Sequence, residues 1–188
     1  MKNNIQLAKK ILKKGGIVVY PTDTAYALGC KFRNKKGIKK ILQIKKRKDN
    51  KFTLIASSLA QVKKYFLLNS CELKIAKKYW PGPVSIVVSP KYSIRVPKNN
   101  IARKLARAVK EPIIATSLNI SGEKTIYDLR RERTRAFRTK VDAIINIGPL
   151  TKRKTSTIIQ CLNKKTPGFK PGDIKIIRHG QTTIRLPA

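Results

Sequence analysis

Short apolar runs alternate with lysine-covered helical patterns along the whole chain, and this alternation restricts the fold more than any other feature. Runs such as Ile17–Tyr20, Val84–Val88 and Ile113–Thr116 are rich in β-branched residues, which is typical of buried strands. The segments between them carry apolar residues at helical spacing. Because no internal repeat or linker interrupts the alternation, we expect residues 1–188 to form a single α/β domain with a twisted mixed sheet flanked by helices.

Capping residues and breakers predict where individual elements begin and end. Asn4 is expected to cap the first helix, and Pro21 is expected to end the strand at Ile17–Tyr20, because proline cannot donate to a sheet ladder. A polar helix is expected over Ile126–Phe137. Further strands are expected at Thr53–Ala56, Ser93–Val96, Ala143–Ile147, Thr157–Ile159 and Ile174–Ile177, and a loop at Thr166–Asp173.

The bulk properties indicate a globular protein that works in the cytoplasm. Hydrophobic residues make up 41% of 188 residues, and no apolar run approaches the roughly 20 residues of a membrane span. The N-terminus lacks the apolar core of a signal peptide. Cys30, Cys71 and Cys161 are an odd number without a Cys-x-x-Cys pair, so we expect reduced cysteines rather than a disulfide framework or a zinc cluster.

The charge is strongly positive, with 44 lysines and arginines against nine acids and a formal net charge of +35. Such a chain attracts polyanions, so contact with RNA or with nucleotide phosphates is one interpretation. The other is compositional drift in an AT-rich genome, because Lys, Asn and Ile are abundant together. The lysines are spread over nearly every segment, which favours drift for most of them.

Several catalytic patterns are absent from the sequence, including the Walker loop, Gly-x-Gly-x-x-Gly, His-Glu-x-x-His and Gly-x-Ser-x-Gly. His179 is the single histidine and acids are sparse, so a hydrolase triad or paired-carboxylate catalysis has little to build on. Cations and hydroxyls remain. They suit phosphoryl or nucleotidyl transfer, whose transition state requires charge neutralisation and positioning.

The stretch after the first strand also carries a resemblance. Pro21-Thr22-Asp23-Thr24-Ala25-Tyr26-Ala27-Leu28-Gly29 is similar to the signature of the YrdC/TsaC family, the threonylcarbamoyl-AMP synthases. Six further segments resemble the family's motifs in the same order: Lys45-Lys46-Arg47 with Lys51, Trp80–Ser85, Ile94–Pro97, Ala115–Gly122, Ser156–Ile159 and Ile177–Gly180. Without the resemblance, the first stretch reads equally as a polar turn, Lys45 and Arg47 as a solvated face, and Ser117 and Asn119 as turn caps.

The resemblance implies a YrdC-like fold with a positively charged concave face, in the short form without an extra C-terminal domain. It implies that L-threonine and bicarbonate or carbon dioxide give an N-carboxylated threonine, whose carboxylate attacks the α-phosphate of ATP. Pyrophosphate leaves, and threonylcarbamoyl-AMP passes to partner proteins that modify the tRNA adenosine beside the anticodon. Mg²⁺ would come with ATP rather than on protein ligands.

The resemblance also assigns residues to ligands. ATP would be held by Lys45, Arg47, Lys51, Asn119 and Arg178, with Lys45 near the phosphates. L-threonine would be held by Thr24, Arg95, Ser117 and Ser156, with Arg95 as the partner of its carboxylate.

The sequence departs from the family pattern at several positions. Ala56 stands where many members have a histidine near the threonine, so one substrate contact is expected to be missing. Ala27 replaces a glycine, and Gln160 replaces an aspartate. Lys48 and Phe52 replace prolines, and the stretch Leu162–Asp173 is longer than usual.

Other functions stay open from the residues alone. A non-catalytic RNA-binding protein of the same fold would use the positive charge of the concave face. A fold relative with sugar-phosphate chemistry, such as dihydroxybutanone-phosphate synthase, would call for acidic metal ligands that this sequence offers sparingly. A role with carbamoyl phosphate belongs to larger proteins that contain a YrdC-like domain.

Overall fold

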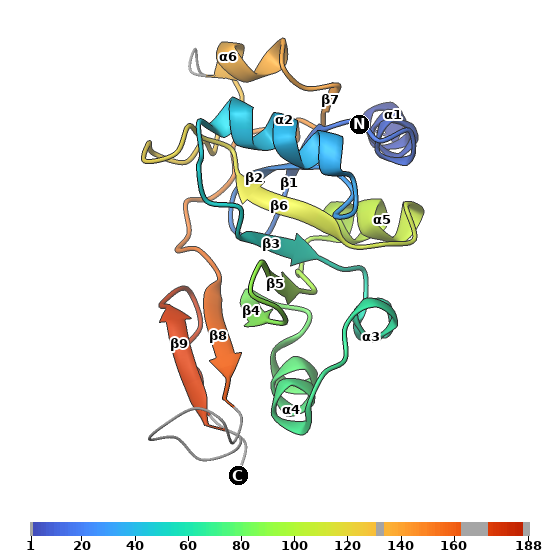
Figure 1. The fold of residues 1–188 in the computed structure, drawn as a ribbon. Coiled ribbons are helices and arrows are strands. Elements are labelled where there is room, and N and C mark those ends of the chain that lie inside the picture. The colour runs from blue at the N-terminus through green and yellow to red at the C-terminus, as the bar shows by residue number, and fades with distance from the viewer. Residues whose placement is uncertain (1, 131–133, 163–172, 186–188) are drawn as a thin grey trace.

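The computed structural model describes residues 2–130, 134–162 and 173–185 (Figure 1). Their strands form one nine-stranded sheet. In spatial order the strands are β7 (Ala143–Ile144), β1 (Val18–Pro21), β2 (Tyr26–Gly29), β6 (Ile113–Ser117), β3 (Phe52–Ile55), β5 (Tyr92–Arg95), β4 (Val84–Val87), β8 (Thr157–Cys161) and β9 (Ile174–Arg178). The pairs β1–β7, β3–β5 and β4–β8 are parallel and the others antiparallel, so the sheet is mixed, as the sequence predicts.

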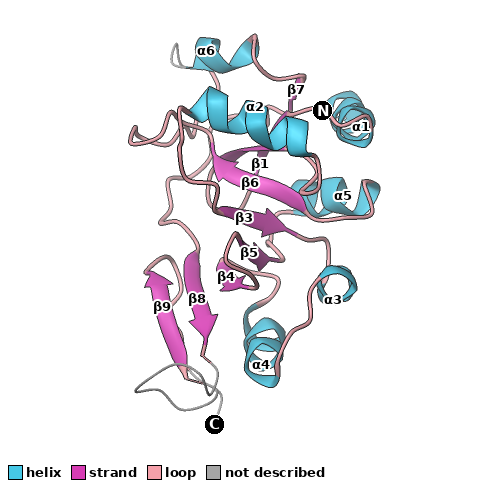
Figure 2. Cartoon of the chain, viewed as in Figure 1, coloured by secondary structure: helices cyan, strands magenta, loops and turns pink. Residues whose placement is uncertain are grey.

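Helices cover both faces of the sheet (Figure 2). On one face, α2 (Lys35–Lys45) buries Ile41 and Ile44 in a cluster with Val19 and other alternate strand residues. On the other face lie α1 (Lys2–Lys13) and α5 (Asn100–Ala108), whose apolar residues pack with Val18, Tyr20 and Ile55. Successive strand residues point to opposite faces, which explains why Val18 and Val19 enter different clusters.

Three further helices complete the described structure: α3 (Leu59–Tyr65), α4 (Ser70–Tyr79) and α6 (Arg135–Arg138). Ser58 caps α3, and its hydroxyl accepts from the Gln61 amide. The α4 helix packs under β4 and β8 in a third apolar cluster. None of the helices in the described ranges is long and apolar enough to cross a membrane.

Close packing at the sheet centre explains one glycine of the family-like signature. A Cβ added to Gly29 would lie 1.9 Å from the carbonyl oxygen of Ile114 on the neighbouring strand β6. The same carbonyl accepts a 2.6 Å hydrogen bond from the buried hydroxyl of Tyr20. The first hairpin therefore approaches β6 too closely for any larger residue at this position.

The predicted fold class is confirmed, but three other predictions are wrong. Asn4 does not cap α1, which already begins at Lys2. The first strand does end at Pro21, which is its last residue and pairs with Tyr26 of β2, a strand that the sequence pattern did not predict. Pro21 fits there because its missing donor is at a strand end.

The prediction of a polar helix over Ile126–Phe137 is also wrong. Within the described part of that range, only Arg135–Arg138 begins a helix. The backbone upstream is bound elsewhere, because the Ile126 amide donates to Leu118 and the Tyr127 carbonyl accepts from Leu150. These long-range bonds use the groups that a local helix would need. Most of the predicted loop at Thr166–Asp173 lies outside the described residues.

The prediction of three reduced cysteines is wrong as well. Cys71 of α4 and Cys161 of β8 form a disulfide with a Cα–Cα distance of 6.2 Å, although 90 residues separate them. Cys30 is free and buried, and burial raises the pKa of its thiol to about 12. The count of cysteines could not show that α4 and β8 meet. The disulfide also removes one reason for expecting a reducing compartment, and the cytoplasmic location stays a prediction.

Candidate active site

A cleft of about 830 Å³ opens where β8 and β9 face the loops that follow β1, α2 and β6. These elements lie on the left of Figure 1, away from α1 and α5. The structure brings seven of the nine predicted site residues to its walls: Thr24, Arg47, Lys51, Arg95, Ser117, Ser156 and Arg178. Segments more than a hundred residues apart in sequence therefore meet around one volume.

Arg95 at the end of β5 is the most buried cation of the cleft. Its side chain is 4% exposed, and its Nη2 donates to Asp23 Oδ1 over 2.9 Å and to Thr24 Oγ1 over 3.2 Å. Burial lowers the pKa of Arg95, while Asp23 acts in the opposite direction. The Arg95 Nε is buried without a hydrogen-bond partner in the described structure. A buried donor left unpaired is costly, so this guanidinium suits an anionic ligand.

Ser156 lies beside a second guanidinium. Its hydroxyl oxygen accepts from Arg178 Nη2 over 3.0 Å and from the fully buried Ser85 hydroxyl over 3.1 Å. A hydroxyl has two acceptor lone pairs and one hydrogen, so the hydrogen of Ser156 stays available to a ligand. Burial lowers the pKa of Arg178, and the positive charge of Arg95 lowers it further. The positive charges of the two arginines repel each other, and a bound anion would offset this repulsion.

Lys45 and Asn119 lie next to the cleft but are not among the residues that line it. Lys45 Nζ donates to the Ser117 carbonyl over 2.6 Å, and to the backbone and side-chain oxygens of Asn119 over 2.8 Å each. Three donors are all that an ammonium group has. Burial lowers the pKa of Lys45 to about 8, with a smaller effect from Arg47. The contacts show Lys45 holding the turn after β6, with its ammonium satisfied by protein.

Asn119 and Ser117 are positioned by the same network. The Ser117 hydroxyl donates to Asn119 Oδ1 over 2.7 Å, and Asn119 Nδ2 donates to the Glu123 carbonyl over 2.7 Å. The turn predicted as an alternative role for these residues is thus present. It does not conflict with ligand binding, because Ser117 still lines the cleft.

The loop after α2 holds Arg47 against the cleft wall. Arg47 Nη2 pairs with Asp49 over 2.7 Å and also donates to the Lys51 carbonyl over 2.7 Å. Its guanidinium lies over the Phe52 ring at 5.4 Å from the centroid. These contacts hold Arg47 in one orientation, with Lys51 and Phe52 beside it on the same wall.

The charge of the cleft lining is strongly positive. Arg47, Lys51, Lys91, Arg95 and Arg178 line it, and Glu72 is the single acidic residue among the described residues that do so. No group of three or more His, Cys, Asp or Glu side chains that could hold a metal ion is found within the described ranges. The lining can therefore neutralise phosphates and carboxylates.

The positions that depart from the family pattern occupy different surroundings. Ala27 and Gln160 line the cleft, so both face any ligand there. Ala56 is fully buried and donates its amide to the carbonyl of Arg95 over 2.9 Å. The expected loss of one threonine contact at Ala56 stays a prediction.

Two residues of the site escaped the sequence analysis. Asp23 holds Arg95 with one oxygen and accepts from the Lys98 amide over 3.1 Å with the other. Ser85 orients Ser156 from beneath. The scarcity of acids could have drawn attention to Asp23, because one of only nine carboxylates lies between two threonines. Ser85 ends the family-like segment Trp80–Ser85, but nothing in the sequence indicates that it contacts Ser156.

Comparison with known proteins identifies the family. A model of the Sua5/YciO/YrdC domain, described as telomere recombination, matches residues 10–180. The chain belongs to the Sua5/YciO/YrdC family. It is 31% identical over 169 residues to the uncharacterized protein YciO of Escherichia coli K12, covering 82% of each chain. It is 31% identical over 190 residues to a putative threonylcarbamoyl-AMP synthase of Methanocaldococcus jannaschii, covering 93% of this chain and 88% of the relative.

Solved structures share the fold. The crystal structure of E. coli YciO superimposes with a TM-score of 0.79 at 29% identity, covering 96% of this chain and 90% of YciO. The structure of P. abyssi Sua5 complexed with L-threonine gives a TM-score of 0.77 at 27% identity and covers 94% of this chain. The chain spans about half of that protein, 54% of its length.

Proposed function

We propose that the protein is a nucleotidyltransferase that forms threonylcarbamoyl-AMP from L-threonine, bicarbonate or carbon dioxide, and ATP. The observation that carries the proposal is the buried guanidinium of Arg95, whose Nε lacks a partner in the described structure, beside Arg178 and the hydroxyls of Thr24 and Ser156. Membership of the family and the names of several relatives support the same reaction class.

The arginine end of the cleft suits an amino acid. Arg95 would bind the α-carboxylate of L-threonine, since a guanidinium forms paired hydrogen bonds with a carboxylate. Ser156, with its hydrogen available, and Thr24 would donate to the same ligand. Ser117 would face it from β6. That P. abyssi Sua5 was solved with L-threonine supports this choice of amino acid.

The other cations of the cleft, together with Arg178, suit the nucleotide. Arg47 and Lys51 would contact the phosphates of ATP from the loop after α2, and Arg178 would reach them from β9. Asn119 and Lys45 would act through the turn after β6, with Lys45 holding the turn rather than the phosphates. Mg²⁺ would enter as the MgATP substrate, bound by phosphate oxygens and water.

The reaction would proceed in two steps. The amine of threonine adds to carbon dioxide derived from bicarbonate and loses a proton to water, which gives a carbamate. A carbamate oxygen then attacks the α-phosphorus of ATP, and the bond to the bridging oxygen breaks as pyrophosphate leaves. Positive side chains around both anions would lower the barrier by stabilising the charge that moves onto the leaving group. The product would pass to partner proteins that modify the tRNA adenosine beside the anticodon.

Pyrophosphate release tests the proposal. The protein is incubated with MgATP and bicarbonate, with and without L-threonine, and we expect release that depends on threonine. Arg47→Ala should abolish most of it, whereas Lys48→Ala, an exposed cation in the next position, should change it little. Pyrophosphate release that does not depend on threonine would contradict the proposed reaction. Equal loss of release in the two variants would contradict the assignment of Arg47.

A second candidate is a non-catalytic RNA-binding protein of the same fold, favoured by the net charge of +35. It predicts RNA binding that weakens with salt and that survives neutral substitution of Arg47 and Asn119. A folded protein that binds RNA in this way, and releases no pyrophosphate under any condition, would replace the first proposal with this one.

A further inference from the structure

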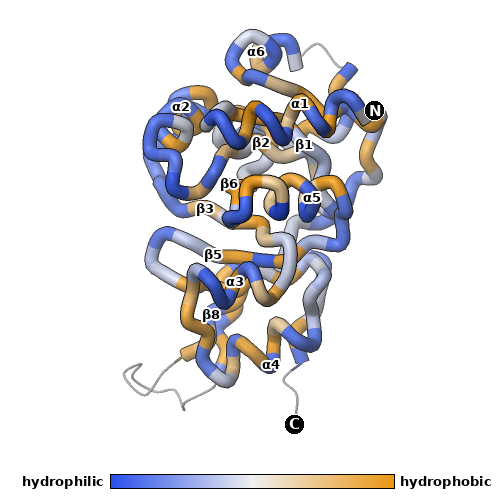
Figure 3. The backbone as a smooth tube through the Cα atoms, turned by 90° about the vertical axis from the view of Figure 1, so that its right-hand side faces the viewer, coloured by the Kyte–Doolittle hydropathy of each residue, from blue (hydrophilic) through white to orange (hydrophobic). Residues whose placement is uncertain are grey.

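A second hollow lies on the side of the molecule away from the cleft. Its volume is about 470 Å³, and it is formed by the end of α1, the turn before α2, the end of α3 and the segment after α5. Figure 3 looks at this side, with α1, α3 and α5 toward the viewer. Its residues are Lys13, Lys14, Gly15, Lys31, Arg33, Asn34, Tyr65, Val109 and Glu111.

The charges of the hollow are not balanced. Four cations surround one acid, and Glu111 is already paired with Lys31 over 2.8 Å. Lys13, Lys14 and Arg33 are exposed and form no ion pair within the described structure. Three like charges therefore face one small volume, and a bound anion would relieve their repulsion.

Arg33 is held in place although no acid binds it. Its guanidinium carbon lies 4.9 Å from the centroid of the Tyr65 ring and 5.4 Å from that of Phe32, and the two rings contact each other edge to face at 5.5 Å. Stacking on rings fixes the plane of a guanidinium and leaves its N–H groups free at the edge. Such a group is preorganised for the oxygens of a phosphate.

The wall of the hollow is rigid where it adjoins Arg33. Asn34 caps α2 by accepting from the Gly37 amide over 3.0 Å, and its Nδ2 donates to the Gly15 carbonyl over 2.6 Å. This bond ties the end of α1 to the start of α2. The backbone that carries Lys13 and Lys14 and the backbone that carries Arg33 are thus held in fixed positions relative to each other, which a recognition site requires.

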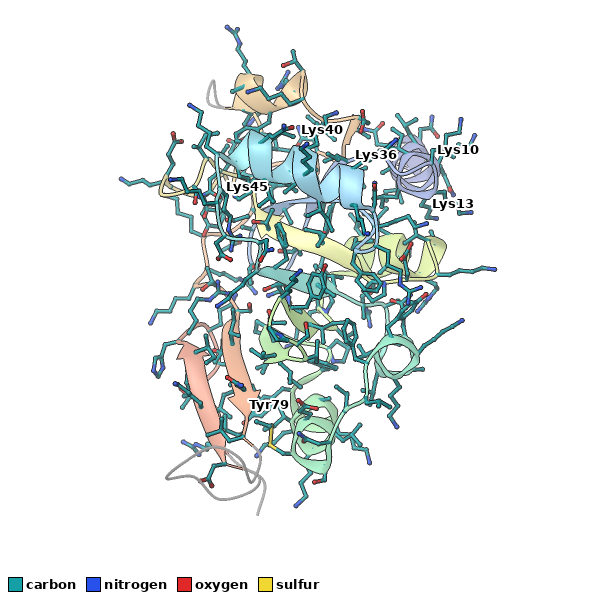
Figure 4. All side chains as sticks on the ribbon, in the orientation of Figure 1. Lys10, Lys13, Lys36, Lys40, Lys45 and Tyr79 are labelled. Carbon is teal, nitrogen blue, oxygen red and sulfur yellow. A yellow bond between two sulfur atoms is a disulfide. The ribbon has the colours of Figure 1, made fainter. Side chains whose placement is uncertain are left out.

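The positive surface continues beyond the hollow. Lys10 of α1 and Lys36 of α2 are exposed, and Lys9 is half-buried. Figure 4 shows Lys10 and Lys13 together on α1 at the side away from β8 and β9. A single small anion would occupy only the hollow. Cations that continue along α1 and at the start of α2, beyond those of the hollow, match successive phosphates along a strand.

We propose that this hollow, with Arg33 stacked on Tyr65 and flanked by Lys13 and Lys14, is a binding site for the phosphodiester backbone of nucleic acid. The site would read phosphate rather than base, because the side chains that face it unpaired are cations. It is separate from the cleft in which the proposed reaction would take place, and it does not rest on that proposal.

Binding of a fluorescein-labelled RNA hairpin, measured by anisotropy over a range of salt concentrations, tests the site. The triple variant Lys13→Gln, Lys14→Gln, Arg33→Gln removes the three unpaired cations. If each contacts one phosphate, the slope of log affinity against log salt falls by about 2 to 3, and affinity at 0.1 M salt falls by about 100-fold.

A matched control removes the same charge elsewhere. Lys74→Gln, Lys77→Gln, Lys140→Gln takes three exposed lysines from α4 and from the segment after α6. We expect a loss of less than about threefold, since these lysines are not among the residues of the hollow and salt screens exposed charges. Arg33→Lys keeps the positive charge but loses the paired N–H donors of the guanidinium. The slope of log affinity against log salt should therefore stay the same, while binding becomes several-fold weaker.

Each other outcome would overturn the site. Equal losses in the two triple variants would mean that RNA responds to total charge alone. An unchanged affinity in the first variant, with an unchanged melting temperature, would mean that the hollow does not bind RNA. Loss of binding to phosphatidylserine vesicles without loss of RNA binding would assign the hollow to a lipid surface. Pyrophosphate release should be unaffected in the first variant, which separates this test from that of the proposed reaction.

Discussion

Replacing Asp23 by asparagine removes the negative charge that accompanies the buried Arg95. The pair is 2.9 Å long, and its side chains are 9% and 4% exposed. Asparagine keeps the size of the side chain but leaves a buried guanidinium without a counter-ion. Breaking a buried ion pair in this way costs about 3 to 5 kcal/mol. We take about 3 kcal/mol, since the amide oxygen still accepts one hydrogen bond, which lowers the melting temperature of a chain of this size by about 6 to 12 °C.

The chain contains a control of the same chemistry on its surface. Arg47 and Asp49 pair over 2.7 Å, but the Asp49 side chain is 53% exposed. Water already solvates both charges there, so Asp49→Asn should cost no more than about 1 kcal/mol. The difference between the two substitutions isolates the effect of burial from that of the Arg–Asp contact.

Urea unfolding followed by the fluorescence of Trp80, the single tryptophan, measures both variants. The double variant Asp23→Asn, Arg95→Met provides a further test, because removing the unpaired charge should restore part of the lost stability. If Asp23→Asn and Asp49→Asn lower the free energy of unfolding by the same small amount, then burial does not make Arg95 depend on Asp23 for its charge balance.

Three further predictions follow from named contacts. The pKa of Lys45 is about 8 in the folded protein and 10.5 in the unfolded chain, so the unfolded chain binds more protons between these values. Relative to Lys45→Met, the wild type should therefore gain about 1.5 kcal/mol of stability from pH 8 to pH 9.5. A constant difference between the two proteins in urea melts would refute this. Cys71→Ser should lower the free energy of unfolding by about 2 to 4 kcal/mol, and the melting temperature of this variant should no longer respond to reductant. Thiol titration of the unreduced, denatured wild type should find one free thiol, that of Cys30. Three free thiols would show that Cys71 and Cys161 are not joined. Ser85→Ala should raise KM for L-threonine more than it lowers kcat, because Ser156 loses the hydroxyl that donates to it. Ser85→Thr keeps a hydroxyl and should restore KM. Equal effects of both substitutions would show that Ser85 does not orient Ser156 for binding.

The fold could be predicted from sequence to the extent that local patterns encode it. Apolar runs located every strand of the described structure except β2. The failures lie where distant segments supply the partners. β2 is short and carries tyrosine, alanine and glycine, and it is a strand because β1 and β6 flank it. The backbone at Ile126 and Tyr127 is bound to segments that precede and follow it, and so forms no helix.

The candidate site divides in the same way. Its hydroxyls and arginines were recognised because they stand in motifs of fixed order, and the structure gathers seven of nine around one cleft. The sequence could not show that Lys45 would satisfy all its donors with protein oxygens, or that Asp23 would hold Arg95. Such pairings depend on segments tens of residues apart.

By itself, then, the sequence determined the class of fold, the positive charge and the residue types that can bind phosphate and carboxylate, because these follow from local spacing and composition. The tertiary structure alone decided which charges are buried and which are balanced. Arg95 and Arg33 are both arginines in the sequence. One becomes a buried partner of Asp23 in the cleft, and the other a stacked, unpaired cation on the far side. Burial and neighbouring charge set the energy of an ionic group, and both are properties of the folded chain.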